Sequence, residues 1–302
     1  MRRPSPLPLP LTGRPFTVAA ARTAGVTPRR LRASDLQSPY RGIRVPAGVE
    51  LDVVDRCSAV LPTLPAGAVF CHVTALRLLD VEVPWTLRRD DDLHIEVPRA
   101  PAVPQRSGLR THTRAGRTVA HVMPFGLPVL PVEHVWTRLG ADLLTDELTV
   151  LADAMTRRRG AHVTVRALER TVARLAPGTR GIRRLREALA LAMPGTDSSM
   201  ESRVRLILVH AGLPCPAVNQ PVVDAAGRFV SMPDMSYPER RIAIEYDGDI
   251  HRTDRAVWRR DIARRQAMEA AGWRVITCTA DDVRDPSRLI TWVRQALAAS
   301  SA

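Results

Sequence analysis

Two stretches near the C-terminal end carry the most information about this chain: Met232-Pro233-Asp234 and, ten residues later, Glu245-Tyr246-Asp247-Gly248-Asp249-Ile250-His251. The apolar run at residues 242–244 predicts a buried strand that leads into the second stretch. Because side chains alternate along a strand, Glu245 and Asp247 would lie on one face at its tip. Asp234 would arrive from the neighbouring strand. We therefore expect three carboxylates to converge at adjacent strand ends.

Such a cluster of carboxylates would be a hard-oxygen site suited to Mg²⁺ or Mn²⁺. We predict Asp234, Glu245 and Asp247 as the metal ligands. A metal held there could activate water and stabilise charge on a scissile phosphate, which indicates phosphodiester hydrolysis. The alternative is that these acids are solvated turn residues that flank a hairpin.

The surrounding residues predict a complete α/β module. Its first helix would begin at Ser198, with Glu201 in the first turn, and end at Gly212 before Pro214. A hairpin and a third strand would follow, then a long helix, a further strand and a last helix. The predicted strands are residues 218–223, 228–232, 240–246 and 273–278, and the long helix is residues 254–271.

Residues 198–297 resemble the endonuclease domain of the PD-(D/E)XK superfamily, specifically the group similar to the very-short-patch-repair endonuclease. The matching pieces are Glu201, Pro233-Asp234, Ile244-Glu245-Tyr246-Asp247-Gly248 with His251 after it, Arg259-Arg260-Asp261, and Gly272-Trp273-Arg274-Val275. The resemblance implies a mixed sheet flanked by helices, with Asp234 and Glu245 as metal ligands. It also implies Glu201 as an auxiliary catalytic acid and His251 as a group that activates water or contacts phosphate.

One position departs from the superfamily pattern, since Asp247 stands where the pattern has Lys. The chain has 44 basic Lys and Arg residues, and all of them are Arg. Arg is a poor proton acceptor because its pKa stays above about 12. A general base must therefore be His251, a carboxylate or metal hydroxide. Asp occurs at this position in the repair-nuclease-like group.

The overall charge favours DNA as a partner. The formal net charge is +13 over 302 residues, which is in the range typical of nucleic-acid-binding proteins. On the predicted helix at residues 254–271, Arg259, Arg260 and Arg264 lie on the polar side. They could follow the phosphate backbone of DNA or form an ordinary solvated face.

The N-terminal region has the pattern of a helix-turn-helix followed by a wing. Residues 16–26 predict a short helix with a Gly stop, and Thr27 and Pro28 predict the start of a second helix. Residues 40–46 would form a small basic hairpin. Residues 1–12 are interrupted by Pro and predict a disordered leader that is neither a signal peptide nor a membrane span. The residues expected to contact DNA are Arg29, Arg30, Arg32, Arg41 and Arg44.

This N-terminal region resembles the winged-helix domain of AbiEi-type antitoxins of type IV toxin/antitoxin systems, which are DNA-binding autoregulators. The resemblance implies a toxin as a further partner. Many helix-turn-helix proteins bind DNA as two-fold dimers, so a homodimer is also an expected assembly. The alternative is that the winged helix contacts another protein and that its arginines are ordinary surface charge.

The middle of the chain carries fewer signals. Residues 52–195 predict a mixture of helices and strands. Four scattered cysteines indicate neither a zinc site nor a disulfide framework and are typical of a cytoplasmic protein. The histidines lack the spacing of a metal cluster, and we expect most of them to be polar surface or strand residues. They are His72, His94, His112, His121 and His134.

The sequence thus predicts five parts: a leader at residues 1–12, a winged helix-turn-helix at 13–50, a small α+β middle region at 51–160, a helical connector at 161–196 and an α/β nuclease-like domain at 197–302. The predicted activity is Mg²⁺-dependent or Mn²⁺-dependent hydrolysis of DNA, in repair or defence. The alternative is a catalytically inactive DNA-binding regulator, antitoxin-like, that keeps the last domain as a basic scaffold. Action on RNA ranks behind both because few aromatic residues are present to stack on bases.

Overall fold

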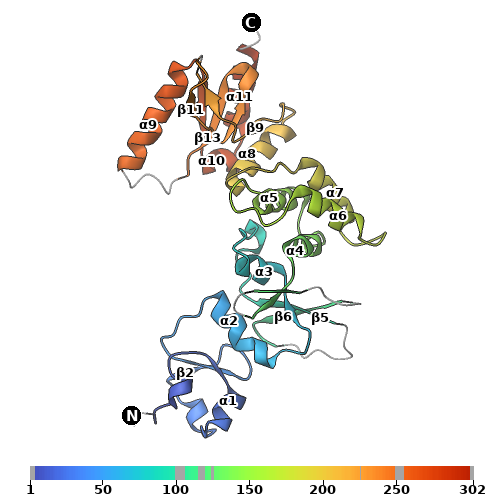
Figure 1. Cartoon of the computed structure of the whole chain (residues 1–302), viewed down its shortest axis with the longest axis vertical. Coiled ribbons are helices and arrows are strands. Elements are labelled where there is room, and N and C mark those ends of the chain that lie inside the picture. The colour runs from blue at the N-terminus through green and yellow to red at the C-terminus, as the bar shows by residue number, and fades with distance from the viewer. Residues whose placement is uncertain are drawn as a thin grey trace. The chain divides into compact units, whose positions relative to one another are not determined.

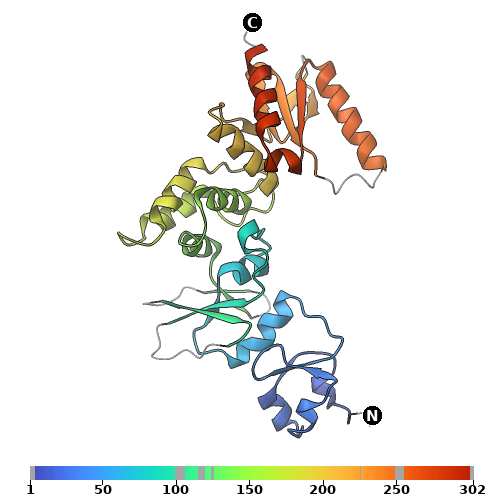
Figure 2. The same ribbon diagram turned by 180° about the vertical axis from the view of Figure 1, so that it is seen from behind.

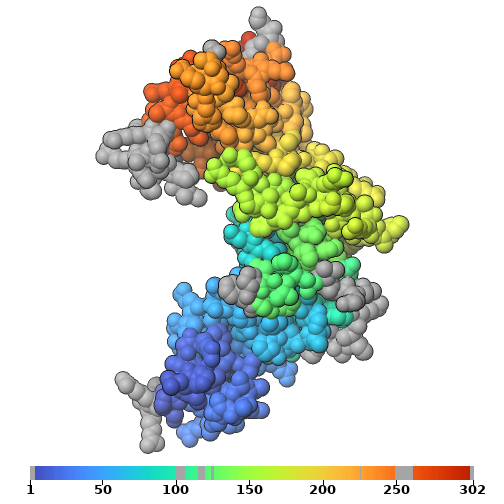
Figure 3. All heavy atoms as spheres, in the orientation of Figure 1, coloured from blue at the N-terminus to red at the C-terminus, as the bar shows by residue number. Residues whose placement is uncertain are grey.

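The computed structural model describes residues 4–98, 106–114, 120–123, 126–224, 226–248 and 255–299, with the backbone alone for residues 255–260. The protein is mixed α/β, with several sheets flanked by helices (Figures 1 and 2). It forms two compact units, Met1–Leu139 and Gly140–Ala302, which run from blue to green and from yellow-green to red in Figure 3. Across the described ranges, no helix is both long and apolar enough to cross a membrane.

The first unit begins with a small three-stranded sheet of order β1-β3-β2. Strand β1 (Phe16–Thr17) leads directly into helix α1 (Val18–Thr23), and the Thr17 hydroxyl caps that helix by accepting from the Ala20 amide at 3.0 Å. Strands β2 (Leu36–Gln37) and β3 (Ile43–Pro46) pair as an antiparallel hairpin. The hairpin expected at residues 40–46 therefore begins earlier, at residue 36.

The prediction of a disordered leader is wrong for the residues that follow the first three. Leu9–Leu11 forms a short 3-10 helix (η1), and the Leu11 side chain is buried. Leu11 packs with Phe16 and Leu31, and Leu7 lies against the same cluster. Proline fixes the backbone angle φ but does not prevent burial of the leucines between the prolines. The proline content therefore does not imply disorder here.

The predicted second helix of the helix-turn-helix is reduced to one 3-10 turn, η2 (Arg30–Arg32). The chain becomes extended at Ala33, where φ is −67° and ψ is 150°. Arg30 holds the departing segment, because its guanidinium donates to both carboxylate oxygens of Asp35 at 2.8 and 2.7 Å. Residues 16–46, all of them described, thus contain one α-helix, α1.

A five-stranded sheet of order β6-β5-β4-β8-β7 forms the centre of the first unit. The parallel pairing of β5 with β6 sets His94 opposite Arg110 and Glu96 opposite His112. The strands are β4 (Val69–Phe70), β5 (Leu93–Pro98), β6 (Leu109–Arg114), β7 (His121–Val122) and β8 (Pro128–Val129). The helices of this part are α2 (Val53–Val60), η3 (Leu61–Thr63), α3 (His72–Leu78), η4 (Trp85–Leu87) and α4 (Val132–Leu139).

The second unit opens with a helical layer. Its helices are α5 (Thr145–Met155), α6 (Val165–Ala173), α7 (Ile182–Leu191) and α8 (Ser199–His210). A buried ion pair joins α5 to α8, since Arg205 Nη2 donates to Asp153 Oδ2 at 2.8 Å. Gly181 has a φ of 82° and approaches the backbone of Gly140 so closely that a side chain would not fit. These contacts place the division of the chain near residue 140, whereas the sequence predicts boundaries at residues 160 and 196.

The main sheet of the second unit has four strands in the order β14-β13-β12-β9. Strand β13 runs antiparallel to β12 and parallel to β14. The strands are β9 (Ala217–Val218), β12 (Met235–Tyr237), β13 (Ile242–Tyr246) and β14 (Arg274–Cys278). Residues 235–237, which the sequence leaves between two predicted strands, thus form the strand β12.

Helices lie on both sides of this sheet (Figures 1 and 2). Helices α8 and α11 (Ser287–Ala299) enclose an apolar core on one face, where Val204, Ile244 and Val293 are fully buried. Helix α9 (Arg255–Ala270) lies on the opposite side. Shorter elements complete the unit: the paired strands β10 (Val222–Val223) and β11 (Phe229–Ser231), the turn η5 (Pro238–Arg240) and helix α10 (Ala280–Arg284).

Candidate functional site

Two of the predicted metal ligands lie side by side at one end of the four-stranded sheet. Met235 pairs with Ile244 across the antiparallel β12–β13 ladder, so Asp234 and Glu245 occupy neighbouring positions on two adjacent segments. The backbone amide of Tyr246 donates to Asp234 Oδ2 at 2.7 Å and holds that carboxyl beside β13. By the alternation of side chains, both acids lie on the face opposite the apolar core.

Glu201 is held near this pair by the N-terminal cap of α8. Its Oε1 accepts from the Ser198 hydroxyl at 2.9 Å, and its Oε2 accepts from the Asp197 amide at 2.9 Å and from Asn219 Nδ2 at 2.8 Å. The backbone amide of Asn219 in turn donates to the carbonyl oxygen of Asp234 at 3.0 Å. Asn219 therefore links the carboxylate of Glu201 to the segment that carries Asp234, a role that the sequence did not indicate.

The electrostatics of these acids favour a cation. Burial, and after it the negative charges of Glu201 and Glu245, raise the pKa of Asp234 to about 7. Burial also raises the pKa of Glu245, and the charges of Arg264 and Arg265 oppose that rise. Repulsion between neighbouring carboxylates raises the free energy of their ionised form, so a bound cation would relieve it.

Helix α9 supplies a positive charge to the same place. Arg264 Nη2 lies 3.2 Å from Glu245 Oε1 and 3.8 Å from Asp261 Oδ1. Glu245 Oε1 is nevertheless buried and accepts no hydrogen bond of good geometry from the described residues. Arg265 donates to Thr277 Oγ1 on β14 at 2.6 Å. Arg264, predicted to contact DNA, thus forms an ion pair with a predicted metal ligand.

The third predicted ligand, Asp247, lies further out. Its side chain is exposed, and its backbone amide donates to the carbonyl oxygen of Cys278 at 2.8 Å. Within the described ranges, Asp234, Glu245 and Asp247 do not form a group whose ligand atoms all lie within 4.8 Å of one another. The predicted catalytic residue His251 and the side chains of Arg259 and Arg260 lie outside the described part of the chain.

The arginines predicted to contact DNA near the N-terminus fall into two groups. Arg30 and Arg44 form hydrogen bonds within the fold. Arg30 pairs with Asp35. Arg44 Nε donates to the carbonyl oxygen of Leu31 at 2.8 Å, and Arg44 Nη1 donates to Ser38 Oγ at 2.7 Å. The side chains of the second group are exposed to solvent. They are Arg29, Arg32 and Arg41.

A second group of titratable side chains, which the sequence did not indicate, lies in the first unit. The rings of His72 and His94 stack with centroids 4.3 Å apart, and His94 Nδ1 lies 2.9 Å from His112 Nε2. His94 Nε2 lies 3.1 Å from Asp90 Oδ2. The ligand atoms of His72, Asp90 and His94 all lie within 4.8 Å of one another, so this group could hold a metal ion.

His72 and His94 are kept neutral by their surroundings. Burial, together with the charges of His94 and His112, lowers the pKa of His72 to about 3. Burial also lowers the pKa of His94, against the opposing effect of its hydrogen bond to Asp90. Neutral imidazole is the form that binds metal ions.

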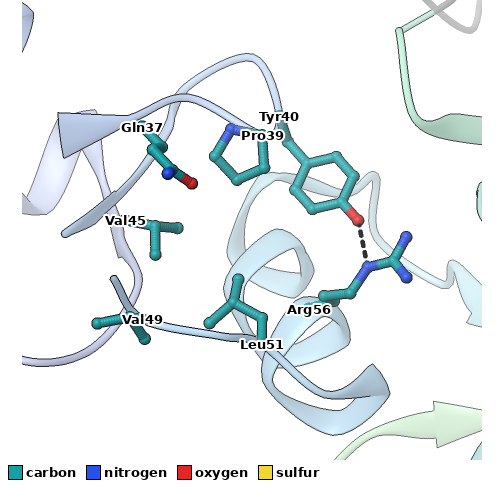
Figure 4. Close-up of a pocket in the computed structure, with 7 residues that line it drawn as sticks. All are labelled: Gln37, Pro39, Tyr40, Val45, Val49, Leu51 and Arg56. Carbon is teal, nitrogen blue, oxygen red and sulfur yellow. Dashed lines mark hydrogen bonds between the residues drawn. The ribbon is translucent and has the colours of Figure 1, made fainter. Parts of the chain in front are cut away.

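A small pocket in the first unit lies between the β2–β3 hairpin and α2 (Figure 4). Arg56 Nε donates to the Tyr40 hydroxyl oxygen at 2.8 Å on its wall. The volume of this pocket, about 200 Å³, is below the ~300–1,000 Å³ typical of ligand sites. Its one charged lining residue, Arg56, already forms the hydrogen bond to Tyr40. We assign this pocket no function. The other lining residues are Gln37, Pro39, Val45, Val49 and Leu51.

Comparison with known proteins gives relatives without a described function. No protein-family model matches the chain. Two uncharacterised proteins of Mycobacterium tuberculosis, one from strain CDC 1551 and one from strain H37Rv, are each 28% identical over 244 residues, which is 80% of this chain and 86% of each relative. An alignment of this length exceeds either unit of the structure and therefore reaches into both.

Proposed function

We propose that the protein is a metal-dependent DNA endonuclease whose site is built on Asp234 and Glu245. The observation that carries the proposal is the position of these two carboxyls at neighbouring ends of β12 and β13, with Glu201 held nearby. This is the arrangement that the resemblance to the PD-(D/E)XK superfamily implies. The carboxyls lie on the sheet face opposite the apolar core.

The residues present fit a hard divalent cation such as Mg²⁺ or Mn²⁺. The donors are carboxylate oxygens, which these ions prefer, and Glu245 Oε1 is buried without a hydrogen bond from the described residues. Burial, and after it the charge of Glu201, raise the pKa of Asp234 to about 7, and a strongly shifted carboxyl beside other acids is typical of a functional site. When bound, such an ion would supply stabilisation of the charge that develops on a scissile phosphate.

The surrounding side chains would orient the acids and balance their charge. The Tyr246 amide fixes one oxygen of Asp234, and the α8 cap with Asn219 fixes Glu201. Arg264 is placed to take the electrostatic part that Lys has in the superfamily pattern, because its guanidinium reaches Glu245 and can contact phosphate oxygens. Removal of a proton from the attacking water is assigned to His251 or to a carboxylate.

DNA is the substrate that the charge favours. The net charge of +13 and the exposed Arg29, Arg32 and Arg41 support a nucleic-acid partner, with these arginines on phosphates. Helix α1 and the hairpin β2–β3 support the proposal, because a helix and a β-hairpin are elements of the winged-helix domain that residues 13–50 resemble. We therefore propose that the N-terminal part of the first unit binds DNA. A cytoplasmic location is part of this proposal.

The test is cleavage of supercoiled plasmid by the full-length chain with Mg²⁺, Mn²⁺ or EDTA. Glu245→Gln removes a carboxylate charge and keeps the side-chain shape, and we expect nicking to fall by orders of magnitude while DNA affinity stays within about two-fold. Asp281→Asn is the matched control, because Asp281 is an exposed acid of the same unit paired with Arg284. Equal cleavage by all three proteins would overturn the assignment of the site.

A second candidate function has its own support. Arg264 already pairs with Glu245, and in the described residues Asp234, Glu245 and Asp247 do not form a group with all ligand atoms within 4.8 Å of one another. In this case the protein is a DNA-binding regulator, antitoxin-like, which could act as a homodimer or with a toxin partner. Salt-sensitive DNA binding without metal-dependent nicking in the same assay would select this function.

A further inference from the structure

We propose that the first unit contains a binding site for one divalent transition-metal ion, of the Zn²⁺ class, with His72, Asp90 and His94 as ligands. Their ligand atoms already lie within 4.8 Å of one another. The site belongs to the first unit, whereas the proposed nuclease site belongs to the second, so neither proposal depends on the other.

Hydrogen bonds between their segments bring the three ligands together. His72 begins α3, Asp90 precedes β5, and His94 lies within β5. Two further residues of α3 hold the other segments: Thr74 Oγ1 accepts from the His94 amide at 2.8 Å, and Arg77 Nη1 donates to the carbonyl oxygen of Asp90 at 2.8 Å. The site is therefore preorganised by its own backbone contacts.

The ring of His94 is oriented for metal binding through its Nε2 atom. That atom lies 3.1 Å from Asp90 Oδ2. For Nε2 to bind a metal ion, the single ring proton of neutral His94 must lie on Nδ1, which would then donate to His112 Nε2, 2.9 Å away. A second ring N–H bonded to a fixed acceptor is the usual support of a metal-binding histidine. His112 is thus a positioning residue.

The geometry requires only a small contraction. Ligand atoms of a tetrahedral Zn²⁺ site with bonds of ~2.0–2.1 Å are separated by roughly 3.4 Å. The pair formed by His94 and Asp90 is already slightly closer than this, and the His72 nitrogen would approach through side-chain rotation. The stacked rings of His72 and His94, with centroids 4.3 Å apart, already lie next to each other.

The chemistry of the donors selects the ion. Two imidazole nitrogens and one carboxylate suit Zn²⁺, Co²⁺ or Ni²⁺, while Mg²⁺ and Ca²⁺ prefer oxygen ligands. Asp90 supplies one negative charge, and Arg110 opposes the cation, with Nη1 at 3.9 Å from Asp90 Oδ2. Arg110 is mainly engaged by Asp92, whose Oδ2 accepts from its Nε at 2.8 Å. Three protein ligands leave the fourth position of a tetrahedral ion to a water molecule. With His72 7% and His94 2% exposed, the ion would link α3, the Asp90 segment and β5.

The experiment uses full-length protein without an affinity tag, stripped with a chelator, then titrated with Zn²⁺ and with Co²⁺ by calorimetry and visible absorption. We expect one ion per chain, tetrahedral Co²⁺ absorption, and a Tm that rises with Zn²⁺ but not with Mg²⁺. Asp90→Asn should weaken Zn²⁺ binding by at least ~10-fold. Asp91→Asn is the matched control, an exposed neighbouring acid outside the ligand group, and should bind as the parent does.

Two further variants make the outcome decisive. Binding of Zn²⁺ should persist in Glu245→Gln, which separates this site from the proposed nuclease site, and in Cys215→Ser, which removes the exposed thiol. The proposal is overturned if folded Asp90→Asn and the parent bind Zn²⁺ equally, or if the folded parent binds no stoichiometric Zn²⁺. Circular dichroism of each variant before titration establishes that it is folded.

Discussion

Arg264 Nη2 on α9 lies 3.2 Å from Glu245 Oε1 on β13, so the long basic helix places a positive charge on the carboxylate group of the second unit. The chain contains no Lys, and this guanidinium lies close to where the proposed reaction would need a cation. Glu245, Asp234 and Glu201 form one electrostatic unit with it, as the mutual effects on the pKa of Asp234 indicate.

Loss of this cation should reduce cleavage. We expect Arg264→Gln to lower the rate of Mg²⁺-dependent nicking by about 10²-fold, the usual cost of one lost charge-stabilising donor. Arg294→Gln, on the exposed surface of α11, is the control and should cleave at the parent rate. Single-turnover cleavage measures both. Equal rates for the two variants would remove Arg264 from the mechanism.

The stability of the metal-free protein should depend on the ionisation of Asp234. Its pKa is about 7 in the folded protein against an ordinary value of 3.8, so the folded state holds a proton that the unfolded state releases between those pH values. The free energy of unfolding should therefore fall as pH rises from about 4 to about 7, by at most ~1.4 kcal/mol per pH unit from this group. Urea unfolding in EDTA at pH 5 and pH 8 measures the fall. Asp234→Asn should lack this component, and an identical pH dependence in both proteins would contradict the account.

Prediction from the sequence succeeded where a local signal existed. Helix α8 begins after its Ser198 cap, as predicted, and β13, α9 and β14 lie close to their predicted ranges. The apolar run before Glu245 was sufficient to locate β13. The adjacency of Asp234 and Glu245 then depended on β12, a three-residue strand followed by Pro238, which is too short for any periodicity to show.

The histidine group of the first unit could not be predicted from the sequence. His72, His94 and His112 lie on three separate elements, and the parallel register of β5 and β6 brings the last two together. No spacing along the chain encodes such a register, because it is set by tertiary packing. The extent of the second unit was missed for the same reason, since Asp153 and Arg205 are distant in sequence and bonded in the fold.

The buried pair of Asp153 and Arg205 should be essential to the second unit. Arg205→Ala leaves the Asp153 carboxyl buried without its partner, and we expect a loss of about 3–5 kcal/mol in the free energy of unfolding. Arg183→Ala removes the exposed pair with Glu187 and should cost less than about 1 kcal/mol. Urea denaturation compares them. Equal losses in the free energy of unfolding would show that the buried pair stabilises the fold no more than the exposed pair does.

The first unit should lose stability in acid when no metal is bound. The pKa of His72 is about 3 in the folded protein against an ordinary 6.5, so the unfolded state binds a proton that the folded state does not. The contribution of this group is complete above pH 6.5 and is lost as pH falls towards 3. His72→Asn removes the titration and tolerates the φ of 52° at this position. Thermal unfolding in EDTA at pH 7 and pH 5 should show a smaller shift for the variant, and equal shifts would contradict the prediction.

The N-terminal arginines should separate into binding and folding residues. Replacing Arg29, Arg32 and Arg41 together with Gln should weaken DNA binding and lower the salt dependence of its affinity, because exposed arginines contact phosphates. Arg30→Gln should instead lower thermal stability, since Arg30 pairs with Asp35. Fluorescence anisotropy at several salt concentrations measures the first effect. An unchanged salt slope in the triple variant would place the DNA-binding surface elsewhere.

The most direct test of the nuclease proposal is the rate of plasmid nicking in Mg²⁺ by the parent, Asp234→Asn and Asp281→Asn, measured alongside DNA affinity. The account predicts cleavage by the parent and Asp281→Asn, none above the EDTA background by Asp234→Asn, and similar DNA affinity for all three. Undiminished cleavage by Asp234→Asn, or no cleavage by a parent that binds DNA, would contradict it.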